Sequence, residues 1–110
     1  MKMHLDKEVF EKVKSGKKTV EMRLYDDKRR ELKVGDTITF ISRNKGEEIK
    51  CEVVNLLTFN NFEELYNSIP KEKLGYEEED IASPADMNLY YSADRQRKYG
   101  VVGIEIKLLS

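Results

Sequence analysis

The chain has 110 residues, of which 39% are apolar and 37% charged, so we expect one domain over residues 1–110. Lys and Arg number 20 against 21 Asp and Glu, and this balance argues against a histone-like binder of nucleic acid. No apolar run approaches the ~18 residues of a membrane span, no signal peptide opens the chain, and no Gly-rich phosphate loop occurs. The single cysteine and single histidine argue against disulfides and structural zinc. We therefore expect a cytoplasmic monomer without metal or cofactor.

The charge is unevenly distributed along the chain. Residues 1–50 carry 14 basic and 10 acidic side chains, whereas residues 51–110 carry 6 and 11. Such a dipole would orient the protein toward a polyanion, although a mixed solvated surface explains it equally well.

The first half predicts two strands and a helix. Residues 1–5 alternate and predict a short strand; Asp6 is the expected N-cap of a helix over residues 7–15, which Gly16 ends. Residues 18–25 alternate strictly, which predicts a half-buried strand. Val20, Met22 and Leu24 form its apolar face, and Thr19, Glu21, Arg23 and Tyr25 form its polar face.

The middle of the chain predicts a hairpin. A charged connector over residues 28–33 and the turn Val34-Gly35-Asp36 precede a strand over residues 37–42. Residues 43–48 indicate a hairpin loop, and residues 49–59 a long strand.

The second half is mainly helical until its last strand. Asn61 is the expected cap of a helix over residues 62–69. Residues 71–88 have no clear pattern, and the acidic run at 77–80 has no evident role. A basic helical turn over residues 93–98 follows.

Residues 101–108 predict a last strand, and Gly103 within it indicates a bend. Short strands with two or three small helices predict an α+β fold, a small mixed β-barrel of five or six strands.

Three stretches share their motifs with a known family. They are F-E-K-V-K-S-G-K-K-T-V-E-M-R-L at residues 10–24, L-K-V-G-D-T-I-T-F at residues 32–40, and Y-Y-S-A-D-R-Q-R-K-Y-G-V-V-G-I-E-I at residues 90–106. Together with F-N-N-F-E-E-L between them, they resemble the ASCH (activating-signal-cointegrator homology) domains of the PUA-like superfamily. The resemblance covers nearly the whole chain and implies a PUA-like barrel with a cleft that binds RNA or a nucleobase-like ligand.

Lys18, Glu21 and Arg23 are the main candidates for that cleft. Lys18 shares parity with Val20 and Met22, so we expect its stem on the apolar face and its ammonium group at the barrel's rim. Glu21 and Arg23 lie on the other face, where Arg suits a phosphate or a base edge and Glu an exocyclic amine. A structural Glu21–Arg23 ion pair is the alternative.

The resemblance also raises two hydrolytic activities. Small bacterial ASCH amidohydrolases deacetylate N4-acetylcytidine with a Lys matching Lys18, a Thr three residues later and a Glu from the second half. Here Glu21 replaces that Thr, and neighbouring Thr19 has the wrong parity to replace it. Other ASCH proteins are ribonucleases, for which Lys18, Glu21 and Tyr91 are the candidates; either activity would be metal-independent.

Aromatic and basic residues extend the candidate site. Tyr90 and Tyr91 can stack on an unpaired base, and Ser92 can bond its edge or cap the helix after it. Arg95–Lys98 forms a basic cluster that either contacts phosphate or is an exposed turn. We expect Cys51 and His4 to be structural. The remaining candidate RNA contacts are Lys17, Tyr25, Arg29 and Arg30.

The sequence therefore favours a domain that binds RNA or a modified nucleoside around Lys18, Glu21 and Arg23. A small hydrolase of RNA or a nucleoside is the alternative, and a protein-interaction domain with a vestigial cleft is a further one.

Overall fold

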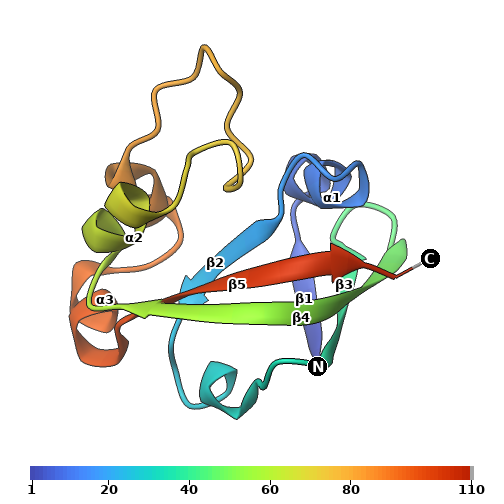
Figure 1. The fold of residues 1–110 in the computed structure, drawn as a ribbon, viewed down its shortest axis with the longest axis horizontal. Helices are drawn as coiled ribbons and strands as arrows, with labels where there is room; N and C mark the ends of the chain where they lie inside the picture. The colour runs from blue at the N-terminus through green and yellow to red at the C-terminus, as the bar shows by residue number, and fades with distance from the viewer. Residues whose placement is uncertain (110) are drawn as a thin grey trace.

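The computed structural model describes residues 1–109, which form five strands and three α-helices (Figure 1). Every predicted strand and helix is confirmed, with its bounds within two residues of the expected ones. In chain order the elements are β1 (Lys2–Leu5), α1 (Lys7–Lys14), β2 (Val20–Leu24), the 3-10 helix η1 (Arg29–Glu31), β3 (Thr37–Ser42), β4 (Glu48–Phe59), α2 (Phe62–Ser68), the 3-10 helix η2 (Pro84–Leu89), α3 (Ala93–Tyr99) and β5 (Val101–Leu108).

The five strands form one mixed sheet in the order β1-β3-β4-β5-β2. β1 runs parallel to β3, and the other neighbours are antiparallel. The sheet curls into a half-barrel whose edges are β1 and β2, with α1 toward one end and α2 and α3 toward the other (Figure 1). The α+β, PUA-like fold is thus confirmed, with a half-barrel in place of a closed one.

A bulge in β4 changes which face of the sheet its odd-numbered side chains point toward, so that the two halves of the strand contribute to different apolar clusters. Its register against β5 shifts between Val53 and Asn55. Because side chains alternate along a strand, one extra residue exchanges the faces. Val53, before the bulge, belongs to one apolar cluster, and Leu57, after it, packs against another.

The first cluster fills the inner, concave side of the half-barrel beneath α1. Cys51 belongs to it and is fully buried as predicted, and burial raises the pKa of its thiol to about 11. The cluster consists of Met3, Leu5, Phe10, Val13, Leu32, Ile38, Phe40, Cys51, Val53, Val102, Ile104 and Ile106.

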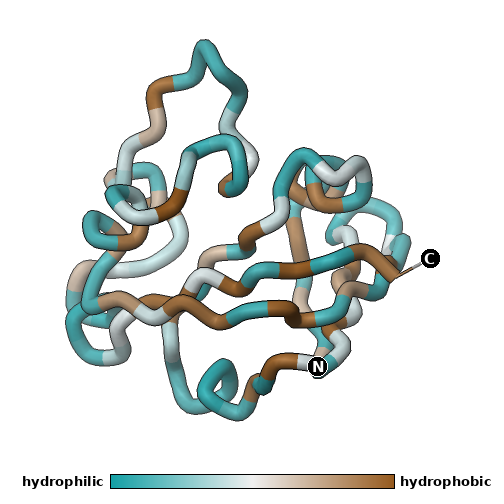
Figure 2. The backbone as a smooth tube through the Cα atoms, viewed as in Figure 1, coloured by the Kyte–Doolittle hydropathy of each residue, from teal (hydrophilic) through white to brown (hydrophobic). Residues whose placement is uncertain are grey.

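The second cluster packs β2 and the outer side of the sheet against α2. Its members are Val20, Met22, Leu24, Phe62, Leu65, Ile69, Leu74, Met87 and Val101. Figure 2 shows hydrophobic residues concentrated along the strands, whereas the loop after α2 is mostly hydrophilic.

Gly103 lies where α2 approaches β5. A Cβ atom at this position would be 3.0 Å from Ile69 Cδ1 and 3.2 Å from Val20 Cγ1. The glycine therefore allows α2 to pack directly on the sheet.

Two of the three expected helix caps are present. The side chain of Asn61 accepts a hydrogen bond from the Glu64 N–H (2.9 Å), and Ser92 accepts one from the Arg95 N–H (3.2 Å). Asp6 occupies the N-cap position of α1, but its side chain makes no capping bond. Its carboxylate pairs instead with Arg43 Nη1 at 2.7 Å, so an ion pair with the residue that follows β3 replaces the cap.

Candidate ligand-binding site

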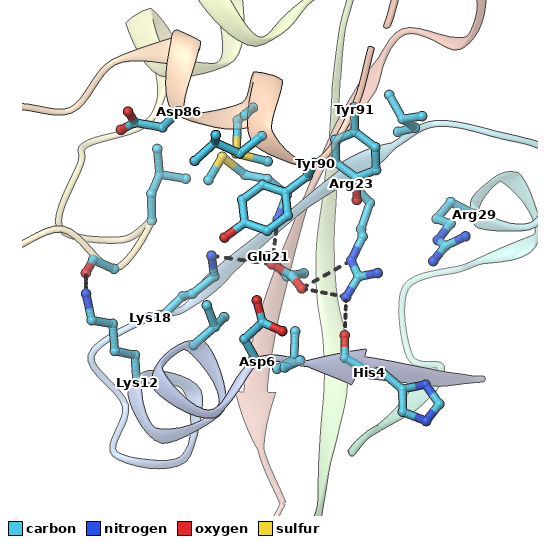
Figure 3. Close-up of a pocket in the computed structure, with 18 of the residues that line it drawn as sticks. His4, Asp6, Lys12, Lys18, Glu21, Arg23, Arg29, Asp86, Tyr90 and Tyr91 are labelled. Carbon is cyan, nitrogen blue, oxygen red and sulfur yellow. Dashed lines mark hydrogen bonds and ion pairs between the residues drawn. The ribbon is translucent and has the colours of Figure 1, made fainter. Parts of the chain in front are cut away.

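A cavity of about 500 Å³ opens between β1, β2, α1 and the segment that leads to α3 (Figure 3). It lies where the two edge strands of the half-barrel face each other. Six of the individually named candidates line it, namely Lys18, Glu21, Arg23, Arg29, Tyr90 and Tyr91, and Arg95 of the candidate basic cluster over residues 95–98 joins them.

Strand pairing explains why Glu21 and Arg23 point inward. Glu21 lies opposite Ile104, and Arg23 lies opposite Val102. Directly paired residues share a face of the sheet, so both polar side chains lie on the inner face with the first apolar cluster. Glu21 is only 4% exposed. The prediction of a half-buried strand was therefore wrong, because α2 covers the apolar face and the half-barrel encloses much of the polar one.

Glu21 is the centre of a compact ionic cluster. Its Oε1 lies 3.3 Å from Lys18 Nζ and accepts the Met22 N–H at 3.0 Å. Its Oε2 accepts hydrogen bonds from Arg23 Nε at 3.2 Å and from Arg23 Nη2 at 3.0 Å. Arg23 Nη2 also donates to the His4 carbonyl of β1 at 3.0 Å. Arg23 thereby bridges the two edge strands.

Lys18 does not lie where its parity predicted. It is 7% exposed, and its ammonium group faces Glu21 rather than the barrel's rim. Lys18 precedes β2, so the alternation of a strand does not govern its direction. The loop orients it instead: its N–H bonds to the Lys12 carbonyl at 3.0 Å, and Gly75 packs closely against its stem.

The electrostatics keep Glu21 and Arg23 ionised. Burial alone would raise the pKa of the Glu21 carboxyl, but Lys18, Arg23 and the Met22 N–H together hold that pKa below its ordinary value. Burial alone would lower the pKa of Arg23, but Glu21 and Tyr91 raise it overall. Two cations and one anion give the cluster a net charge of +1.

Two tyrosines form the aromatic part of the cavity wall. Tyr91 stacks on Phe62 of α2, with ring centroids 6.0 Å apart and planes 17° apart, and burial raises the pKa of its hydroxyl. Tyr90 is 56% exposed, and its ring lies 6.4 Å from that of Tyr91. One tyrosine is thus anchored and the other is open to solvent.

The sequence matches the ASCH domain family over residues 3–110. The chain belongs to the ASCH family. It is similar to the hypothetical protein PH0355, whose crystal structure has a TM-score of 0.82 at 34% identity over 98% of this chain and 97% of that one. It is also similar to the protein PF0455 from Pyrococcus furiosus, whose solution NMR structure gives a TM-score of 0.71 at 35% identity, over 99% and 96%. No curated protein matches it. The PUA-like fold of ASCH domains supports a role in RNA binding.

Four candidate contacts of this ASCH domain do not line the cavity. The side chain of Lys17 is 65% exposed and lies 3.9 Å from Glu77 of the acidic run. The guanidinium group of Arg30 lies 4.3 Å from the Tyr25 ring centroid and donates to a backbone carbonyl of α3. Ser92 caps α3. Each of these side chains already makes a contact elsewhere in the domain.

Sequence reasoning missed several residues that line the cavity. Lys12 Nζ donates to the Gly75 carbonyl at 2.6 Å, and Tyr76 donates to Asp86 at 2.7 Å. Lys12 follows Val9 by one helical turn, a spacing that could have placed it beside the apolar face. Tyr76 and Asp86 come from the irregular segment after α2, where no periodic pattern gives a signal.

The cavity is lined by six cationic side chains and four carboxylates. The cations are Lys12, Lys18, Arg23, Arg29, Arg43 and Arg95, and the anions are Asp6, Glu21, Asp26 and Asp86. Within residues 1–109, no three His, Cys, Asp or Glu side chains come together as metal ligands. No helix in the same range is long and apolar enough to cross a membrane.

Proposed function

We propose that this ASCH domain binds single-stranded RNA, or a modified nucleoside, in the cavity around Lys18, Glu21 and Arg23. The observation that carries the proposal is the buried cluster of net charge +1 in a cavity with an exposed tyrosine in its wall.

The dimensions and the lining suit such a ligand. A volume of about 500 Å³ lies within the range of small-molecule sites. Unpaired bases stack on aromatic side chains, and Tyr90 offers an exposed ring for this contact. The excess of cations among the lining residues favours a ligand that carries phosphate.

The state of Glu21 favours binding over catalysis. A general base works best when its pKa lies near the operating pH, whereas the pKa of Glu21 is lowered. Thr19, the hydroxyl nearest to Lys18 in sequence, does not line the cavity around Glu21; it lines a second cavity, to which Lys18 also contributes. These observations support binding ahead of the hydrolytic alternatives, in which Lys18, Glu21 and Tyr91 would act on the ligand.

Binding is tested by titrating the protein with a panel of nucleosides and short single-stranded RNAs at two salt concentrations. Lys18→Met removes the ammonium group and keeps the stem. We expect it to weaken binding about tenfold or more, because a hydrogen bond to a charged group contributes about 1.5–3 kcal/mol. Lys17→Met, at the adjacent exposed position, is the matched control and should change affinity less than about twofold.

Comparison with the Lys17→Met control shows which results would contradict the proposed binding site. Equal losses in the two variants would remove the cavity from the binding site. Absence of binding to every nucleoside and RNA at both salt concentrations would favour the protein-interaction alternative.

A further inference from the structure

The ionic cluster leaves several hydrogen-bond donors free in the cavity. The Lys18 ammonium group has three N–H donors and directs one toward Glu21. Arg23 donates from Nε and Nη2 to Glu21 and His4, and its guanidinium group also interacts with the hydroxyl of Tyr91, so it is already engaged. Arg29 Nε is buried and has no acceptor within the described chain. An orphaned buried N–H is costly, so Arg29 Nε, together with the remaining N–H donors of Lys18, favours a ligand that brings acceptors.

The acceptors of Glu21, in contrast, are all in use. An ionised carboxylate offers about four lone-pair sites. Four donor groups approach Glu21, two at each oxygen: the Met22 N–H and Lys18 Nζ at Oε1, and two nitrogens of Arg23 at Oε2. A ligand N–H could reach this carboxylate only by displacing one of them.

The other carboxylates in the cavity are partly engaged. Each already accepts a hydrogen bond from a neighbouring side chain. The pairs are Asp6 with Arg43 at 2.7 Å, Asp26 with Arg29 at 3.3 Å, and Asp86 with Tyr76 at 2.7 Å.

From this imbalance we infer that the cavity binds the oxo-bearing edge of a planar ring, as in uracil or hypoxanthine, in preference to the amino-bearing edge of cytosine or adenine. The inference rests on the binding function proposed above and specifies its ligand. An oxo group accepts from the remaining N–H donors of Lys18 without disturbing Glu21. An amino group in the same place would meet N–H donors and lose its hydration without compensation.

The ring N–H beside the oxo group also finds an acceptor. Asp6 points its carboxylate into the cavity between Lys18 and Arg23 (Figure 3). Its Oδ2 makes no hydrogen bond to the described residues, since Arg43 contacts Oδ1. The side chain of Asp6 is 52% exposed, so this acceptor lies nearer the solvent than Glu21.

A phosphate group also presents acceptors, but the apolar lining favours a ring. Tyr91 is anchored on Phe62, and Met22, Leu24 and Met87 also line the cavity. Burying these surfaces stabilises a bound ring and does nothing for a small, hydrated anion.

Two matched ligand pairs test the inference with the unaltered protein. Uridine is compared with cytidine, and inosine with adenosine, by NMR or calorimetric titration. Within each pair we expect the oxo nucleoside to bind about tenfold more tightly, because one lost charge-assisted hydrogen bond corresponds to at least that factor. Inorganic phosphate at equal concentration should not displace uridine. Equal affinities, a preference for the amino nucleosides, or displacement by phosphate would overturn the inference.

The Lys18→Met and Lys17→Met variants test whether the preference for oxo nucleosides depends on the ammonium group of Lys18. We expect Lys18→Met to reduce the uridine-to-cytidine ratio toward one and Lys17→Met to retain it. A ratio unchanged by Lys18→Met would overturn the assignment; if that variant does not fold, the ligand pairs decide alone. Binding of all four nucleosides without discrimination would defeat this inference and leave the proposed function intact. Absence of binding to nucleosides and RNA would defeat both.

Discussion

The two apolar clusters differ in what borders them. The first, inside the half-barrel, is bordered mainly by aliphatic side chains, with Tyr25 as its only tyrosine neighbour in the described chain. The second, beneath α2, is bordered by four tyrosines, Tyr66, Tyr76, Tyr91 and Tyr99. Tyrosine combines an apolar ring with a polar hydroxyl, so the second cluster can face a polar cavity while remaining packed. Both clusters thus stabilise the sheet; the first reaches the cavity wall through Leu5, and the second through Met22, Leu24, Leu74 and Met87.

The largest effects should come from removing one phenylalanine from each cluster. Phe40→Ala and Phe62→Ala each remove a fully buried ring, and we expect each to lower the free energy of unfolding by about 3–5 kcal/mol. Only Phe62→Ala should also weaken ligand binding by the remaining folded protein, because Phe62 stacks against Tyr91. Urea denaturation gives the first quantity, and titration below the melting temperature gives the second. Equal affinities of the two variants would show that the second cluster does not support the site.

Glu21→Gln separates charge from packing on the inner face. The amide keeps the shape but leaves Lys18 and Arg23 buried without an anion, and we expect a loss of about 3 kcal/mol at neutral pH. Because the pKa of Glu21 is lowered in the folded state, its stabilisation is complete above the unfolded pKa of about 4.3 and is lost as the pH falls through the lower folded value. The stability difference between the two proteins should therefore shrink below about pH 4, measured by urea denaturation from pH 7 to pH 3. A difference independent of pH would mean that Glu21 is not a buried anion.

Gly103→Ala tests the closeness of α2 to the sheet. The added methyl group would meet Ile69 and Val20, both members of the second cluster. Overpacking of this kind costs about 1–3 kcal/mol, which thermal unfolding would detect. Gly103→Ala combined with Ile69→Val gives the side chains room, so the double variant should recover part of the loss. A stable single variant would indicate that α2 lies farther from β5.

Arg29 and Arg30 should differ although they are adjacent. Arg29 lines the cavity, whereas Arg30 stacks on Tyr25. If the ligand is RNA, Arg29→Ala should weaken binding across sequences and reduce the salt slope by about 1, and Arg30→Ala should have a smaller effect. Titrations of one oligonucleotide at several salt concentrations give both slopes. An unchanged slope in Arg29→Ala, and in the double variant, would remove this patch from the interface.

Deacetylation of N4-acetylcytidine should be the smallest effect. Glu21 stands where the amidohydrolases that the chain resembles have Thr, so we expect little or no release of acetate. Robust turnover by the purified protein that disappears in Lys18→Ala would contradict this expectation.

The sequence predicted the regular elements well because each has a local cause. The strand over residues 37–42 and the one over residues 101–108 have the predicted bounds, and Asn61 and Ser92 cap their helices as expected. These features depend on alternation and on side chains close to their own backbone. Contacts with residues far away in the sequence are not needed to specify these elements.

The site was less predictable because it is assembled from distant segments. The expectation that the ammonium group of Lys18 lies at the rim extended strand parity two residues beyond the start of β2. Substituting a surface lysine usually changes the free energy of unfolding very little. That expectation does not apply to Lys18, which is buried and paired with Glu21. Tyr76 and Asp86 reach the cavity from a segment without periodicity, so only the folded chain reveals them.

The bridge that Arg23 makes between β2 and β1 has a consequence for self-association. The edge strands of an open sheet carry unpaired N–H and C=O groups, which can recruit a strand from another copy. Here Glu21 accepts the Met22 N–H at the edge of β2, and Arg23 donates to the His4 carbonyl at the edge of β1. The side chains of Glu21 and Arg23 thus satisfy backbone groups that a sixth strand would otherwise pair with. These groups are no longer available to a strand from another molecule, while the gap between β1 and β2 stays accessible to small molecules.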